Sequence, residues 1–83
     1  MPTVYRYGGY RFFFYSNEGS ERPHIHIQRG EDVAKFWLTP EVERVDSFGM
    51  NSHELAKLES VVRSKRTFLE RKWHDFFGAA GTR

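Results

Sequence analysis

Cysteine is absent from this chain of 83 residues, and so is any apolar run near the 18 residues that a membrane-spanning helix needs. Without cysteine, disulfide bonds and thiolate metal sites are excluded, and nothing in the composition points to secretion. No hydrophobic signal-peptide segment follows Met1. We therefore expect a cytoplasmic protein that does not associate with a membrane.

The chain is also short, and much of its apolar content lies in aromatic rings. A chain of this length buries only roughly two thirds of the surface that its unfolded state exposes, so it supports a single core. Eight Phe, four Tyr and two Trp can fill that core, and each buried ring removes on the order of 150–250 Å² from water. The sequence predicts one domain over residues 1–77 and a flexible tail over residues 78–83.

The first half of the chain has the composition of strands. Gly8-Gly9 and Gly30-Glu31 are tight-turn signals, and Pro23 favours an extended chain just after it. Residues 39–50 have no clear periodicity, and we expect a short edge strand or an irregular connection there. The predicted strands, rich in β-branched and aromatic residues, are 3–7, 10–15, 24–28 and 33–38.

The C-terminal third has the pattern of an amphipathic helix. Asn51 can cap a helix, and Glu54 can complete a capping box three residues later. Gly78 is a stop signal. We predict an α+β fold, in which an antiparallel sheet of three to five strands packs under one long helix over residues 51–77. The apolar residues that share one face of this helix are Leu55, Leu58, Val62, Leu69, Trp73, Phe76 and Phe77.

Two histidines one residue apart, His24 and His26, form the pattern that most resembles a chemical site. If the next turn is centred on Gly30-Glu31, antiparallel pairing places His26 opposite Lys35 and His24 opposite Trp37, so that all four share one face. The other face is the expected floor for the helix, and it carries Ile25, Ile27, Ala34 and Phe36. The histidine face is therefore predicted to be open to solvent or to a partner.

Alternation along residues 10–15 adds further side chains to both faces. Tyr10, Phe12 and Phe14 share one side, and both sides of this strand are apolar, so we expect a central strand or one that is covered on both faces. Because alternate residues of a strand point to opposite faces, the other three residues are assigned to the histidine face: Arg11, Phe13 and Tyr15.

A face with histidine, lysine, arginine, tryptophan and tyrosine offers proton transfer, phosphate neutralisation and base stacking. In a ribonuclease hypothesis, His24 and His26 act as general base and general acid, and Lys35 or Arg11 stabilises the charge that develops on the phosphorus centre. The same residue types also dominate protein interfaces. The residues that we predict to bind the partner or substrate are Arg11, Tyr15 and Trp37.

Two other interpretations of the histidines stay open. Side chains at i and i+2 of a strand lie about 7 Å apart and can converge on one zinc ion. A third ligand would come from Glu18, Glu21 or His53, but nothing in the spacing selects among them, and we predict no metal and no other cofactor. In the second interpretation the histidines are half-exposed strand residues that fix the neighbouring loop by hydrogen bonds.

The formal net charge of +2 is unevenly distributed. Residues 1–50 hold six Lys or Arg and seven Asp or Glu, a net charge of −1, whereas residues 51–83 hold seven and four, a net charge of +3. This bias allows an acidic partner or a nucleic acid without requiring either. The basic residues of the predicted helix are scattered around its circumference, which favours simple solvation over a groove-binding helix.

The motifs described above resemble those of the bacterial family called domain of unknown function 4160. The likeness covers nearly the whole chain, including Glu54-Leu55 at the start of the helix and Trp73 near its end. The chain has Arg22 where the usual pattern has a second proline, and its loop is longer by Gly19-Ser20. The strings that carry the resemblance are Gly9–Glu18 (GYRFFFYSNE), Pro23–Ile27 (PHIHI) and Ala34–Leu38 (AKFWL).

Members of that family are often predicted, from operon context, to belong to toxin–antitoxin modules beside a second small protein. The resemblance implies a partnered role related to RNA or DNA. We expect a component of such a module whose open face binds RNA or a cognate protein encoded next door, as in a ribonuclease toxin. The alternative is a non-catalytic antitoxin or adaptor that binds its partner through the same face. Binding to operator DNA and formation of a homo-oligomer stay open.

Overall fold

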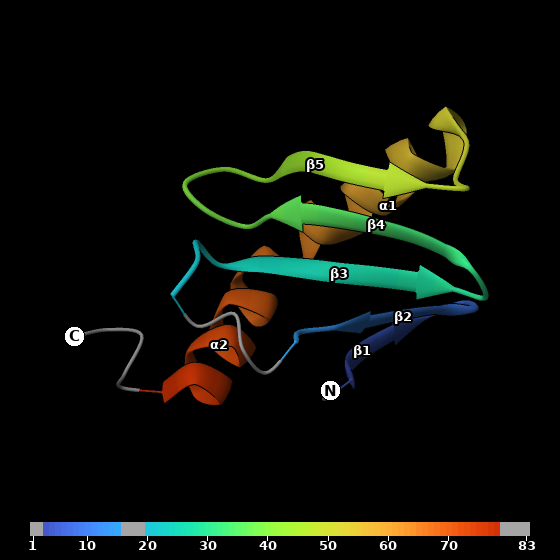
Figure 1. The fold of residues 1–83 in the computed structure, drawn as a ribbon. Helices are drawn as coiled ribbons and strands as arrows, with labels where there is room; N and C mark the ends of the chain where they lie inside the picture. The colour runs from blue at the N-terminus through green and yellow to red at the C-terminus, as the bar shows by residue number, and fades with distance from the viewer. Residues whose placement is uncertain (1–2, 16–19, 79–83) are drawn as a thin grey trace.

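The computed structural model describes residues 3–15 and 20–78. Its strands form one antiparallel sheet in the order β1-β2-β3-β4-β5, so each strand lies beside its neighbours in sequence, and two helices pack behind the sheet (Figure 1). The predicted α+β class is confirmed. The elements are β1 (Thr3–Tyr7), β2 (Tyr10–Phe13), β3 (His24–Arg29), β4 (Asp32–Trp37), β5 (Glu43–Phe48), α1 (Ser52–Ser64) and α2 (Arg66–Phe77).

The predicted register of the β3–β4 hairpin is confirmed. His26 pairs with Lys35, and His24 pairs with Trp37. The turn holds Gly30 at a φ of 61°, a left-handed conformation that glycine adopts without steric cost, which explains why the chain reverses there. His24, His26, Lys35 and Trp37 therefore lie on one face of the sheet, and the residues that alternate with them lie on the other.

Residues 39–50 contain a full edge strand with an irregularity. Asp46 pairs with Lys35 and Arg44 pairs with Phe36, so Val45 is an extra residue in β5 and forms a β-bulge. Asp46 and Phe48 consequently lie on the same side of the sheet as Lys35, while Arg44 lies on the side of Phe36. The bulge breaks the period of two, which is why the sequence pattern of this stretch is unclear.

The core lies between the sheet and the helices. The predicted floor of Ile25, Ile27, Ala34 and Phe36 is buried in it, as are Tyr10, Phe12 and Phe14 of the second strand segment. From the helices come Leu55, Leu58, Val62, Leu69 and Trp73.

The last turn of α2 departs from the predicted buried stripe. Phe77 is partly buried, but Phe76 is 40 % exposed. Both rings contact Phe14, which lies one residue beyond the end of β2. Phe77 lies one turn after Trp73, and their ring centroids are 4.2 Å apart, so Phe77 continues the buried stripe and Phe76 lies at its margin.

The predicted single helix is divided at Lys65, whose φ of −106° and ψ of 12° lie outside the helical range. A straight helix over residues 52–77 would be roughly 39 Å long, as long as the largest extent of the molecule, 38 Å. The break lets α1 pack on β4 and α2 on β3 (Figure 1). Neither proline nor glycine lies near this position, so the sequence carries no signal for it.

The start of α1 is bound to the sheet. The Asn51 side chain accepts a hydrogen bond from the Glu54 N–H at 2.8 Å, which confirms the predicted cap. The Glu54 carboxylate accepts a hydrogen bond from the Tyr10 hydroxyl and lies 2.9 Å from the Arg29 guanidinium. The Tyr10 hydrogen bond lowers the pKa of Glu54 and raises that of Tyr10.

Within the described residues, neither helix is long and apolar enough to cross a membrane. The predicted tail, apart from Gly78, and the predicted loop residues 16–19 lie outside the described part of the chain. Gly78 ends α2 at a φ of 62°, in agreement with the predicted stop signal.

Candidate functional site

One face of the sheet is turned away from both helices (Figure 1). We call it the open face. Cross-strand pairing places Phe13, His26, Lys35 and Asp46 in one row across it, and Arg11, Gln28, Val33 and Phe48 in the next. The structure thus brings together the predicted residues of β2, β3 and β4. Tyr15 joins them, because its ring meets those of Phe13 and His26 at centroid distances of 5.2 Å and 4.6 Å.

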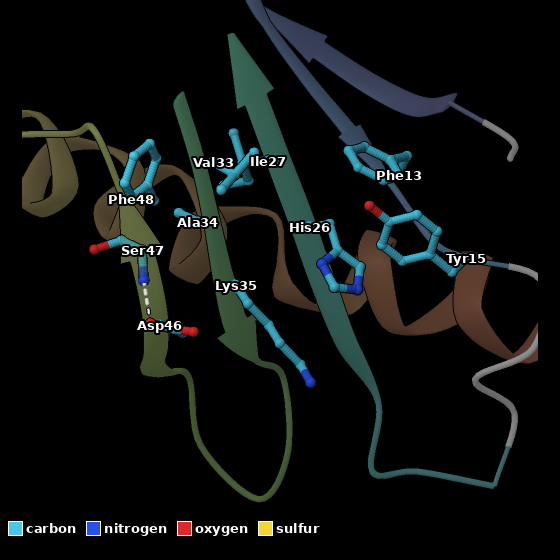
Figure 2. Close-up of a pocket in the computed structure, with 10 residues that line it drawn as sticks. All are labelled: Phe13, Tyr15, His26, Ile27, Val33, Ala34, Lys35, Asp46, Ser47 and Phe48. Atoms are coloured by element: carbon cyan, nitrogen blue, oxygen red, sulfur yellow. Dashed lines mark hydrogen bonds between the residues drawn. The ribbon is translucent and has the colours of Figure 1, made fainter. Parts of the chain in front are cut away.

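A hollow of about 240 Å³ lies at the centre of the open face (Figure 2). Phe48 on β5 and Tyr15 beyond β2 stand at its two sides, and they are 72 % and 40 % exposed. Exposed rings around a mostly apolar depression are typical of a binding surface. The lining residues are Phe13, Tyr15, His26, Ile27, Val33, Ala34, Lys35, Asp46, Ser47 and Phe48.

His24 is not on the solvent surface, and this part of the expectation is wrong. Its side chain is fully buried although its register is the predicted one. β2 ends at Phe13, opposite His26, so no β2 residue pairs with His24. The Trp73 ring of α2 contacts it, with 4.9 Å between centroids, and Trp37 contacts it at 5.6 Å.

The His24 ring also holds the chain that leads into β3. Its Nδ1 lies 2.8 Å from the carbonyl oxygen of Arg22, so the nitrogen donates and the carbonyl accepts. This contact agrees with the interpretation in which a histidine fixes the loop by a hydrogen bond. An imidazole in this position reaches an external substrate only if the surrounding rings move apart.

His26 lies at the aromatic wall of the hollow. It is partly exposed, stacks on Phe13 at 5.5 Å between centroids and meets His24 edge-on at 5.0 Å. Its ring lines the hollow beside Tyr15 (Figure 2). Of the two predicted catalytic histidines, His26 is therefore the one that a bound molecule can touch.

The Trp37 ring contacts two cations. The Lys35 ammonium is 4.8 Å from the centre of its ring and the Arg22 guanidinium is 4.3 Å from it. Each cation also has an acidic partner, at 3.3 Å for Lys35 and Glu21 and at 3.5 Å for Arg22 and Glu43. The charges of Lys35 and Arg22 are thus balanced by acidic side chains of the protein.

Arg22 has a structural role in this part of the chain. Besides stacking on Trp37, its Nε donates to the carbonyl oxygen of Thr39 at 2.9 Å. The chain before β3 is thereby attached to the connection between β4 and β5.

Arg11 covers an aromatic ring. Its guanidinium carbon is 4.2 Å from the centre of the Phe13 ring, and its Nε and Nη2 are buried without a hydrogen-bond partner among the described residues. Phe13 is consequently buried although it belongs to the open face. Phe13 therefore lines the hollow with little of its ring exposed, and Arg11 is not among the lining residues.

The residues of the site that were not predicted include Asp46 and Phe48. Both lie in β5 after the bulge, where the period of two is broken, so alternation could not assign them to a face. One feature of the sequence could have pointed to Phe48: it is an apolar residue immediately before Gly49, at the end of a stretch predicted to be an edge strand or an irregular connection. Asp46 Oδ1 accepts a hydrogen bond from the Ser47 N–H at 2.9 Å.

Within residues 3–15 and 20–78, no three His, Cys, Asp or Glu side chains are arranged to hold a metal ion. Of the three residues considered as a third ligand, Glu18 lies outside the described residues, and Glu21 is 4.0 Å from His24 Nδ1 but is also paired with Lys35. His53 lies in the first turn of α1.

Comparison with known proteins points to one family. Residues 9–74 match the family model described as domain of unknown function (DUF4160); the match runs from β2 into α2 and includes every residue that lines the hollow. The chain matches no curated protein and no solved structure.

Proposed function

We propose that this chain, which belongs to the domain of unknown function (DUF4160) family, is the partner-binding component of a toxin–antitoxin-type module and binds a cognate protein through its open face. The observation that carries the proposal is the apolar hollow flanked by Phe48, a ring that is 72 % exposed. Exposed aromatic surface of this kind marks an interaction site. The module type comes from the family resemblance, and the cognate protein is expected from the neighbouring gene.

The charges of the open face favour a protein over RNA. Lys35 is paired with Glu21 and Arg22 with Glu43, and Asp46 adds a further negative charge to the lining of the hollow. Binding to a phosphate backbone depends on an excess of positive charge. Aromatic rings beside balanced charges are instead the composition of a protein interface.

The face is also a better docking surface than the β5 edge of the sheet. A bulge at Val45 distorts β5, and the Ser47 N–H is already bonded to the Asp46 side chain. Both features hinder the addition of another strand. A partner is therefore expected to lie across the open face.

Co-purification with the product of the neighbouring gene tests the proposal. The wild type is expected to retain that protein, and Phe48→Ala is expected to weaken the complex roughly tenfold, because aromatic rings are frequent hot spots of protein interfaces. Phe68→Ala is the matched control, since Phe68 is a partly exposed ring on α2. Equal binding by Phe48→Ala and the wild type, or no binding by the wild type, would refute the proposal.

RNA cleavage is a second candidate, favoured by one observation: His26 and Lys35 both line the hollow. His26 could act as a general base and Lys35 could stabilise negative charge. His24 is too deeply buried to act as the general acid in this conformation. Cleavage of RNA by the purified wild type, lost in His26→Ala, would support this candidate, whereas the absence of cleavage would discard it.

A further inference from the structure

We infer that the hollow of the open face receives an arginine side chain of the partner protein, held between Asp46 and the ring of Phe48. This inference rests on the proposed function and specifies the chemistry of the partner. It begins from a carboxylate that the described part of the chain does not neutralise.

Asp46 and Lys35 are direct cross-strand partners, yet they do not form an ion pair. The Lys35 side chain extends away from Asp46 (Figure 2), and its ammonium lies 3.3 Å from Glu21 and over the Trp37 ring. The next cation along β5, Arg44, pairs with Glu59 of α1 on the opposite side of the sheet. Among the residues that the structure describes, no cation pairs with Asp46.

Phe48 supplies an aromatic surface within reach of this carboxylate. It follows Asp46 by two residues on the same face of β5, a separation of about 7 Å along a strand. A flat guanidinium stacked on the Phe48 ring can therefore also donate hydrogen bonds to Asp46. Arginine suits this geometry better than lysine, because its planar group stacks on rings and binds carboxylates through two parallel donors.

The rest of the hollow suits the aliphatic part of an arginine side chain. Val33 pairs with Phe48 across the strands and is exposed, and Ile27 and Ala34 also line the hollow. The stem of an arginine can lie on such apolar surface while its charged end reaches the rim. A volume of about 240 Å³ accommodates one large side chain and not a folded segment.

Titration of the purified full chain with a small probe tests the inference without the partner. The probe is N-acetyl-arginine methylamide, and the control probe is the citrulline analogue, which has the same shape and no charge. Amide chemical shifts of Asp46, Ser47 and Phe48 report binding. We expect the arginine probe to bind roughly fivefold more tightly than the citrulline probe, the effect of one exposed ion pair, and Asp46→Asn to remove the difference.

Asp75→Asn is the matched control, because Asp75 is an exposed carboxyl on α2. It should leave the preference for arginine unchanged. Equal binding of the two probes, a preference that survives in Asp46→Asn, or shifts confined to other parts of the chain would overturn the inference. A lysine probe that binds as tightly as arginine would also overturn it.

The partner protein separates this inference from the proposed function. If the wild type and Asp46→Asn bind the partner equally while Phe48→Ala does not, the open face is the interface but no arginine docks at Asp46. If the wild type binds no partner, the proposed function itself fails.

Discussion

At the scale of single residues, His24 is the side chain whose surroundings most constrain its role. It is enclosed by Trp37, Trp73 and His26 and donates to the carbonyl of Arg22. We expect His24→Ala to lower the free energy of unfolding by about 3 kcal/mol, because it leaves a cavity among rings and an unpaired carbonyl. Urea denaturation followed by circular dichroism measures the change.

His26→Ala is the comparison for that experiment. His26 is partly exposed, so its truncation should cost less than that of His24. If His26→Ala proves as destabilising as His24→Ala, the burial of His24 does not give it a larger structural role than His26, and the prediction is wrong.

Glu54 makes a contribution to the stability of the folded protein that depends on pH. The hydrogen bond from Tyr10 and the charge of Arg29 lower the pKa of Glu54 in the folded protein. A lowered folded-state pKa gives stability that is present above the unfolded value, about 4.3, and is lost as the pH falls through the folded value. We expect the Tm to fall below about pH 4.3 in the wild type and to fall less steeply in Glu54→Gln.

Thermal unfolding at pH 7 and in acid checks this expectation. Glu31→Gln is the control, because Glu31 is an exposed carboxyl in the turn between β3 and β4. Its Tm profile should follow the wild type. Parallel profiles for Glu54→Gln and the wild type would contradict the assignment.

At the scale of elements, Arg66 binds the start of α2 to the connection between β4 and β5. Its Nε donates to the carbonyl of Leu38 at 2.9 Å, and its Nη2 donates to the carbonyl of Pro40 at 2.8 Å. We expect Arg66→Ala to lower the free energy of unfolding by about 1–2 kcal/mol through these lost bonds.

Lys57→Ala on the exposed side of α1 is the control for Arg66, and its effect should stay within about 0.5 kcal/mol. Chemical denaturation of both variants gives the comparison. A loss in Arg66→Ala no larger than that in Lys57→Ala would show that the contact does not hold the helix in place.

At the scale of the whole molecule, one core joins the sheet to both helices, and unfolding should be a single transition. Trp73 lies in the core and Trp37 on the open face, and both rings contact His24. We expect tryptophan fluorescence of the wild type and of Trp37→Phe to give the same midpoint as far-UV circular dichroism. Separate midpoints would show that the open face unfolds independently of the core.

The sequence by itself determined the first four strands, the turns after β1 and β3, and the register that pairs His26 with Lys35. These depend on alternation and on glycine at tight turns, which act over a few neighbouring residues. The same local pattern correctly separated Ile25 and Ile27 in the core from His26 on the open face.

Only the tertiary structure decided which members of the open face a partner can reach. His24 is buried by Trp73, which lies 49 residues later, and Asp46 and Phe48 reach the hollow through the bulge at Val45. The break at Lys65 likewise follows from fitting the helices to the sheet. These features depend on contacts between distant segments, and the local periodicity of the sequence does not predict such contacts.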